Sequence, residues 1–287
     1  MLPSFRHHAR LPFTPPYDAA ALLAAQRVHA VTGLDEPYEP DAASITRSIR
    51  TADGPAVIRA RFGDDLVDLD ATVPIDDDLT ARVRRWLDLD VDPRSVLTAL
   101  GEDPVLGTLI DRRPGLRILG HLDDFEAASF AVLGQQVSLA AARTFQRRFV
   151  VAYGDPVAGT DYRAFPTARA IAALDVLRVR EAIGLTRSRA ATLHAVAVAL
   201  ADGLAFDGEP GLVRERLLAL PGIGPWTADY LAVRAVGDRD AFPVGDLVLR
   251  RALGSVSAAH AERLSQPWRP VRAYAAFHLW TAHAYLP

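Results

Sequence analysis

The hydrophobic periodicity of this chain changes once along its length, and that change constrains the fold. Between residues 44 and 73, apolar and polar residues alternate with a period of two in three short runs, separated by Asp53-Gly54 and Gly63-Asp64. Such runs predict strands joined by hairpin turns, hence a small antiparallel sheet. From residue 123 nearly to the end, apolar residues recur instead with the 3.6-residue period of helices.

A proline and two glycines in RRPGLRILG, at 112–120, mark the expected boundary between these parts. We predict an α+β protein: a small mixed α/β domain with an antiparallel sheet over 1–112, then an all-helical domain over 113–287. Helices are also expected in the first domain over 18–31, with Asp18 as the N-cap, and over 78–100. His7 and His8 are interpreted as a flexible basic end. In the second domain helices are expected at 123–133, 138–152, 167–173, 178–184, 187–203, 212–219, 225–236, 247–253, 258–264 and 270–284.

The composition narrows the chemistry. Half of the 287 residues are apolar, which favours a packed globular protein. The chain contains no cysteine, which excludes disulfides, thiolate-bound zinc, iron–sulfur clusters and a cysteine nucleophile. No apolar run reaches the roughly 18 residues of a membrane span, and the first residues lack the hydrophobic core of a secretion signal. We expect a cytoplasmic protein with no membrane partner.

The net charge of −3 is unevenly distributed. Residues 1–115 contain 13 Arg against 19 acids, a balance of −6, whereas residues 116–287 contain 19 Arg against 16 acids, a balance of +3. The mildly basic second part is compatible with a polyanionic partner but is a weak signal. All 32 basic residues are arginine, so the chain has no lysine amine.

The motif that carries most information is LPGIGPWTADY, at 220–230, between two helical segments. Gly222 and Gly224 permit a tight turn, and Pro225 suits the first position of the following helix. The free amides at such a helix start form an anion site suited to a phosphate. A dinucleotide-binding loop would need a preceding strand and a third glycine, which this stretch lacks. The hairpin alone leaves an ordinary capped turn and a phosphate-binding turn equally open.

An aromatic pair and an aspartate follow the hairpin. Trp226 and Tyr230 are four residues apart and therefore share one helix face. Asp246 follows Gly245 and begins a short helical segment. Considered alone, this aspartate is more typical of an N-cap than of a catalyst. The helix dipole nevertheless stabilises negative charge there, as an electrostatic catalyst requires.

The run 220–253 resembles the helix-hairpin-helix, Gly/Pro-rich loop and aspartate of the DNA glycosylase superfamily. More narrowly, the chain resembles 3-methyladenine DNA glycosylase II, the AlkA type, over nearly its whole length and in the same order. PPYD at 15–18 resembles the amino-terminal domain of that type. RPGLRILGHLDDFEAASFAVLGQQVSLAAA at 113–142 resembles its first helical segment, and WRPVRAYAAFHLW at 268–280 resembles its closing helix.

The resemblance implies a glycosylase domain with the helix-hairpin-helix at 212–236 and a loop at 237–246 that ends on the catalytic carboxylate, Asp246. This carboxylate would stabilise positive charge on the deoxyribose as the N-glycosidic bond breaks, and would steer or activate the attacking water. Three hairpin amides would bind a DNA phosphate, those of Gly222, Gly224 and Thr227. No cofactor is expected beyond a structural Na⁺ or K⁺, which family hairpins hold through main-chain carbonyls; the matching positions are Leu218, Leu220 and Ile223.

Trp226 occupies the position at which strand-cleaving members such as endonuclease III have a Schiff-base lysine. Because the chain has no lysine, the resemblance implies a monofunctional glycosylase that leaves an abasic site and an intact strand. Trp226, Tyr230 and Trp280 fit an aromatic pocket for the extruded base. An N3- or N7-alkylated purine is positively charged, and an aromatic face attracts cations by about 0.5–2 kcal/mol. The alternative is that all three aromatics are core residues. Without the resemblance, that interpretation would be favoured for Trp280, which shares a helix with Tyr274 and Phe277.

Opening the duplex costs a few kcal/mol, and AlkA-type enzymes fill the vacated space with a side chain from a GQxVS turn. Here the turn is residues 134–138, and the wedge position is Gln136, where the best-known form has leucine. Two other departures affect the substrate range: Leu247 replaces a tyrosine, and Ala25 stands where an aromatic residue could reach the pocket. 3-Methyladenine and 7-methylguanine are the expected substrates, with hypoxanthine and ethenoadenine as further candidates.

The expected function is base excision repair of alkylated purines in duplex DNA, by a monomer that flips the base and hydrolyses its N-glycosidic bond. Two alternatives stay open. A helix-hairpin-helix DNA-binding module without catalysis would need neither Asp246 nor the aromatic residues. A related glycosylase for an oxidised or mismatched base would commonly have the lysine or the cysteines that are absent here.

Overall fold

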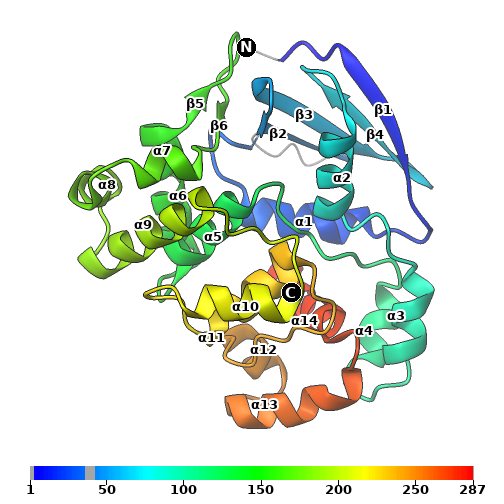
Figure 1. Ribbon diagram of the computed structural model, residues 1–287. Coiled ribbons are helices and arrows are strands. Elements are labelled where there is room, and N and C mark those ends of the chain that lie inside the picture. Colours follow the sequence, from blue (N-terminus) through cyan, green and yellow to red (C-terminus); the bar gives the residue numbers. More distant parts are fainter. Residues whose placement is uncertain (1–2, 36–42, 287) are drawn as a thin grey trace.

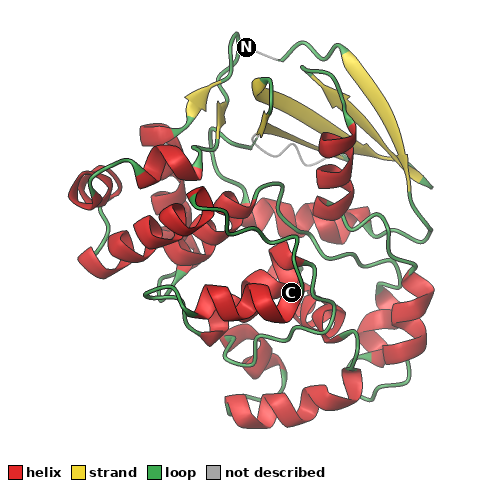
Figure 2. Ribbon diagram, viewed as in Figure 1, coloured by secondary structure: helices red, strands yellow, loops and turns green. Residues whose placement is uncertain are grey.

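The computed structural model describes residues 3–35 and 43–286. A four-stranded antiparallel sheet of order β1-β4-β3-β2 forms the amino-terminal part (Figures 1 and 2). Of its strands, β2 (Ser44–Thr51) and β3 (Gly54–Phe62) are joined at the Asp53-Gly54 turn, and β4 (Leu66–Ala71) follows the second turn. The period-two segments therefore form the small antiparallel sheet that they predict.

The strand β1 (His7–Pro12) has no counterpart in the sequence prediction. It pairs with β4 along its whole length, from His7 opposite Ala71 to Pro12 opposite Leu66. His8 also contacts a carboxylate, with 3.2 Å between its Nδ1 and Oδ1 of Asp70. The interpretation of His7 and His8 as a flexible end is wrong, because the open edge of β4 supplies the hydrogen bonds that order this segment.

The helices of the first part differ from prediction at one break. The N-cap Asp18 accepts the amide of Ala21 at 2.9 Å and begins α1 (Ala19–His29). The single helix expected over 78–100 is two helices, α2 (Asp77–Trp86) and α3 (Pro93–Leu100). Between them Asp88 has a left-handed backbone with φ of +52°. A further helix that was not predicted, α4 (Gly107–Arg112), follows.

Asp88 holds this break against the carboxyl-terminal part of the chain. Its Oδ2 accepts the Tyr274 hydroxyl at 2.8 Å and the Ile118 amide at 3.2 Å. Burial raises the pKa of the Asp88 carboxyl to about 6, more than these hydrogen bonds lower it. Because its pKa is raised, keeping the Asp88 carboxyl ionised at neutral pH lowers the stability of the folded protein.

Replacing Asp88 by asparagine is expected to raise the free energy of unfolding above about pH 6 by up to about 3 kcal/mol. The folded pKa of about 6 exceeds the ordinary 3.8, so the folded protein binds more protons between these values and loses stability as the pH rises through them. Asparagine stays neutral and tolerates positive φ. Urea unfolding near pH 8 and near pH 4 checks this. An equal gain at both pH values would show that the charge is not the cause.

Helices make up most of the second part, and each predicted segment contains one. They are α5 (Asp124–Gly134), α6 (Leu139–Tyr153), α7 (Ala168–Ala172), α8 (Val176–Ile183), α9 (Arg187–Ala201), α10 (Pro210–Leu218), α11 (Pro225–Leu231), α12 (Leu247–Ala252), α13 (Ala258–Ser265) and α14 (Arg272–Trp280). The π-helical turns η1 (Ala232–Val236) and η3 (Thr281–Tyr285) extend α11 and α14, and the 3₁₀ turn η2 (Gln266–Trp268) follows α13. A short hairpin, β5 (Asp155–Pro156) with β6 (Arg163–Ala164), follows α6. None of the described helices is long and apolar enough to cross a membrane.

The buried side chains form two clusters. One joins the sheet, α2, α3 and α4 to the carboxyl-terminal helices, with Ile58, Trp86 and Phe277 among its members. The other lies among α5 to α11 and includes Phe149 and Leu193. The carboxyl-terminal helices thus share a core with the amino-terminal sheet, and the segments on either side of the site belong to different cores. The boundary between residues 112 and 113 stays a prediction.

A buried ionic cluster joins the sheet to the helical part. Arg47 of β2 donates through Nη2 to Oε1 of Glu126 of α5 at 2.9 Å, and its Nε lies 3.4 Å from Oδ1 of Asp35. Burial favours the neutral form of Glu126, but the Arg47 guanidinium and His121 together outweigh it, and the pKa of this carboxyl lies below its ordinary value. Burial raises the pKa of Asp35 and lowers that of the nearby His121. No local sequence pattern indicates this cluster, because its members come from distant parts of the chain.

Candidate active site

A cleft of about 590 Å³ lies where three segments of the chain meet. One wall is the turn after α5, at 134–137, and another is the hairpin from Gly222 to Thr227. The third is formed by residues 245–247 at the start of α12. The cleft therefore brings together the predicted wedge, the predicted phosphate-binding amides and Asp246, of which the wedge and Asp246 lie 110 residues apart in the sequence.

Asp246 caps α12, as its position after Gly245 predicts. Its Oδ1 accepts the amides of Val248 and Leu249 at 3.0 and 3.1 Å. The same oxygen accepts the indole N–H of Trp280 at 3.1 Å, and Oδ2 accepts that of Trp226 at 2.9 Å. Since all four partners are N–H donors, the contacts stabilise negative charge on the carboxylate. Asp246 is 9% exposed and lines the cleft, so the carboxylate that caps α12 also faces the cleft. Its role as the catalytic group stays a prediction.

The two tryptophans position this carboxylate, a role that the sequence analysis did not assign to them. Trp226 lines the cleft and stacks on Tyr230, with ring centroids 5.5 Å apart and planes at 25°. Tyr230 is half-buried behind it, 5.9 Å from the ring of Trp280, which is buried. The three rings are therefore one cluster, but only Trp226 is among the residues that line the cleft. Their role as a base pocket stays a prediction.

Arg234 contacts Tyr230 of this aromatic cluster and was not among the predicted site residues. It lies in η1, is 2% exposed, and donates through Nη1 to the Tyr230 hydroxyl at 3.2 Å. Its Nε donates to the carbonyl of Leu119, a residue of the core that also contains Trp280. Its position four residues after Tyr230 was the available signal, because helical neighbours at that spacing share a face.

The hairpin leaves amides free at the mouth of the cleft. The amides of Gly222, Gly224 and Thr227 have no acceptor in the described part of the chain, and α11 has no side-chain cap. Gly222 has φ of +82°, and a Cβ there would lie 1.9 Å from Oγ1 of Thr192 on α9. Glycine is therefore required at 222 by the close approach of α9, and the unpaired amides leave donors available to an anion.

Gly222→Ala is expected to lower the free energy of unfolding by at least about 2 kcal/mol, through the positive φ and the collision with Thr192. Gly224 is a matched control, because its φ is −98° and no atom lies within 4 Å of a Cβ built there. Gly224→Ala should leave stability within about 0.5 kcal/mol of the parent. Urea unfolding of both variants measures this, and parental stability in Gly222→Ala would contradict the observed packing.

The two adjacent glutamines in the turn after α5 have different contacts. Gln135 donates through Nε2 to the Gly222 carbonyl at 3.1 Å and to Oγ1 of Thr227 at 3.0 Å, so it ties this turn to the hairpin. Arg189 of α9 donates to the Gln135 carbonyl at 2.5 Å. Gln136 is exposed, lines the cleft and has φ of +52°. The wedge position is thus free to contact a ligand, and the clamp formed by Gln135 was missed by the sequence analysis.

The other predicted site residues differ in their surroundings. Leu247 is 54% exposed at the cleft, whereas Ala25 is fully buried in the core. The carbonyls of Leu218 and Ile223 accept no hydrogen bond from described residues, and that of Leu220 accepts only the amide of Ile223 at 3.1 Å. The monovalent-cation site expected on these three carbonyls stays a prediction. No cluster of acidic or imidazole side chains that could hold a metal occurs among the described residues.

Two family models match the two parts of the chain. The chain matches the model of the HhH-GPD superfamily of base excision DNA repair proteins over residues 130–269, and that of the AlkA N-terminal domain over 8–123. The fold, with its helix-hairpin-helix and following loop, places the protein in this superfamily. It is 32% identical to DNA-3-methyladenine glycosylase 2 of Escherichia coli K12, with 96% of this chain and 98% of that protein covered. The chain therefore belongs to the AlkA family of DNA-3-methyladenine glycosylases.

Two further proteins are similar to this chain, and one of them is longer. The chain is 38% identical to the probable bifunctional transcriptional activator/DNA repair enzyme AlkA of Mycobacterium tuberculosis H37Rv, over 95% of this chain. It spans only 56% of the length of that relative. The solved 3-methyladenine DNA glycosylase from Archaeoglobus fulgidus superposes with a TM-score of 0.83 at 21% identity, covering 97% of this chain and all of that one. This last likeness shows the fold.

Proposed function

We propose that the protein is a DNA glycosylase that hydrolyses the N-glycosidic bond of alkylated purines in duplex DNA, as a step of base excision repair. The observation that carries the proposal is the position of Asp246. Its carboxylate lies in the same cleft as the free hairpin amides and is held there by four N–H donors. The names of the relatives, which include DNA-3-methyladenine glycosylase 2, support the same reaction.

The proposed mechanism assigns one task to each wall of the cleft. The amides of Gly222, Gly224 and Thr227 bind a backbone phosphate, which places the target sugar beside Asp246. Gln136 fills the gap that the extruded base leaves. The Asp246 carboxylate then stabilises the positive charge that develops on the sugar and orients the attacking water. Alkylation has already made the base a cationic leaving group, so little proton-transfer machinery is needed.

The proposed substrates are 3-methyladenine and 7-methylguanine, and the reaction leaves the strand intact. Trp226 stands where a Schiff-base lysine would be needed, and the chain contains no lysine. Trp226, Tyr230 and Trp280 are proposed to attract the charged base through their ring faces. A Na⁺ or K⁺ on the carbonyls of Leu218, Leu220 and Ile223 would brace the hairpin. We also propose action as a cytoplasmic monomer.

Chromatography of the bases released from methylated duplex DNA tests the proposal. The protein should release free methylpurines, whereas the same DNA without methylation should release none. Borohydride treatment during the reaction should trap no covalent enzyme–DNA adduct. Binding of the methylated duplex without any base release would favour the non-catalytic DNA-binding module, and release of an oxidised or mismatched base instead would favour the related glycosylase.

A further inference from the structure

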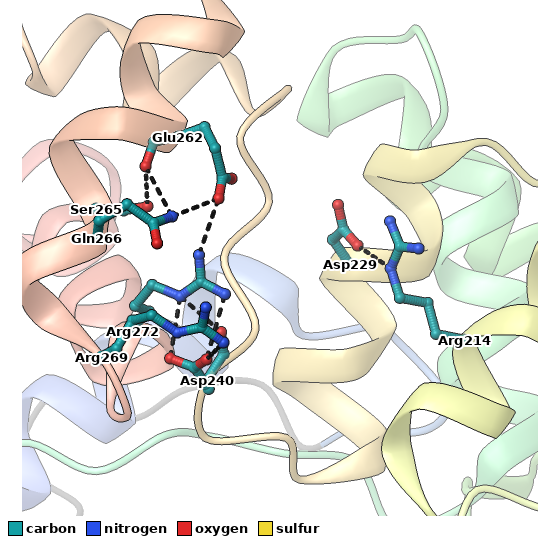
Figure 3. Close-up of polar contacts among 8 residues, drawn as sticks. All are labelled: Arg214, Asp229, Asp240, Glu262, Ser265, Gln266, Arg269 and Arg272. Carbon is teal, nitrogen blue, oxygen red and sulfur yellow. Dashed lines mark hydrogen bonds and ion pairs between the residues drawn. The ribbon is translucent and has the colours of Figure 1, made fainter.

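A further polar network lies at the start of α14 (Figure 3). Arg272, the first residue of that helix, bonds through Nε to both Oδ1 and the backbone carbonyl of Asp240, at 3.0 and 2.9 Å. Arg269 reaches the other carboxylate oxygen of Asp240 at 2.5 Å. Arg272 also donates through Nη1 to Glu262 of α13 at 3.3 Å. Asp240 is thus held by two arginines from the segment that leads into α14.

Asp240 connects this network to the loop that ends at Asp246. Asp240 belongs to the loop 237–246, six residues before the carboxylate of Asp246. The backbone reinforces the contact, because the amide of Ala273 donates to the carbonyl of Arg239 at 2.9 Å. At its far end the same helix α14 carries Trp280, whose indole donates to Asp246 at 3.1 Å. One helix therefore contacts the loop at both of its ends.

The helix acts as a fixed spacer between these contacts. Arg272 and Trp280 are eight residues apart, which corresponds to about 12 Å along a helix. A helix of this length is stiff, so fixing Asp240 at one end fixes where the loop must end relative to Trp280 at the other. We infer that Arg272 is a positioning residue: with Asp240 it sets the register of the loop so that Asp246 meets Trp280 and faces the cleft.

The loop also has an apolar anchor, which makes the inference testable. Phe242 is 4% exposed and packs against Trp268, with ring centroids 5.6 Å apart. If this anchor alone placed the loop, the ion pair would be dispensable. Arg214 and Asp229 line the same pocket as Asp240 and Arg272. Arg214 provides a matched control (Figure 3), because it pairs with Asp229 at 2.7 Å and neither residue belongs to the loop.

The inference rests on the proposed glycosylase function, and the kinetic test separates positioning from stability. Arg272→Gln and Asp240→Asn should lower kcat for release of methylpurines by about 10- to 100-fold, the effect of displacing a reacting group by a fraction of an ångström to 1 Å. Affinity for duplex DNA containing an abasic site should change by no more than about twofold, because the hairpin is unaltered. Arg272→Lys should fall between, since an ammonium lacks the planar fork that spans several acceptors. Arg214→Gln should keep the parental kcat.

A spectroscopic readout is independent of catalysis. The four tryptophans of the chain give four indole N–H signals in a ¹⁵N spectrum, and Trp280→Phe assigns the one that reports the bond to Asp246. Arg272→Gln and Asp240→Asn should shift that signal and speed its exchange with solvent, while Arg214→Gln should not. Should Arg272→Gln fail to fold, Asp240→Asn and Arg272→Lys carry the test.

An unshifted Trp280 signal together with parental kcat in Arg272→Gln or Asp240→Asn would overturn the inference. If the parent protein released no methylpurine, the proposed function would fail, and the Trp280 signal would still decide whether Arg272 positions the loop.

Discussion

Asp246→Asn is expected to release methylpurines at least about 100-fold more slowly than the parent, equivalent to about 3 kcal/mol of transition-state stabilisation. The substitution removes the negative charge that faces the sugar cation. It also replaces one acceptor oxygen by an N–H₂ group. Because all four partners of the parent carboxylate are N–H donors, this group cannot accept a hydrogen bond from any of them. Single-turnover release from methylated duplex DNA measures the effect.

A second variant separates the two causes. An asparagine whose oxygen keeps the three donors of Oδ1 presents its N–H₂ group to the indole N–H of Trp226. Adding Trp226→Phe removes that donor. If mispairing with this indole caused the loss of activity in Asp246→Asn, the double variant would regain part of that activity. We expect no restoration, because the missing charge dominates. Release by Asp246→Asn within about tenfold of the parent would remove this carboxylate from the mechanism.

Arg47→Ala is expected to lower the free energy of unfolding by about 3–5 kcal/mol, because it leaves the carboxylates of Glu126 and Asp35 buried without their cation. Both side chains are 5% exposed, so water cannot replace the guanidinium. Urea unfolding near neutral pH measures the loss. The loss should shrink towards acidic pH, where the two carboxyls are protonated and no longer need a counter-ion.

Removing the whole charge set at once provides the control. A triple variant that combines Arg47→Met, Glu126→Gln and Asp35→Asn carries no uncompensated buried charge and should recover most of the lost stability. A triple variant as unstable as Arg47→Ala would mean that packing of the arginine side chain, and not its charge, holds the two parts together.

Much of the fold could be predicted from local pattern. The period-two runs form β2, β3 and β4, and each segment with helical periodicity contains a helix. The errors occur where long-range contacts decide the structure. β1 is ordered only because β4 offers a free edge, and the helix expected over 78–100 breaks at Asp88, which Tyr274 binds from almost 190 residues away.

The candidate site divides in the same way. The hairpin, the cap at Asp246 and the lack of a lysine could all be inferred from the amino-acid order, because glycine, proline and aspartate act within a few residues of where they stand. Three-dimensional packing was needed to show that the indoles of Trp226 and Trp280 bind the carboxylate, that Gln135 ties two turns together, and that Arg272 holds Asp240. Those hydrogen bonds join residues up to 92 positions apart. No local pattern specifies them, because side-chain partners at such separations are chosen by how the two cores pack.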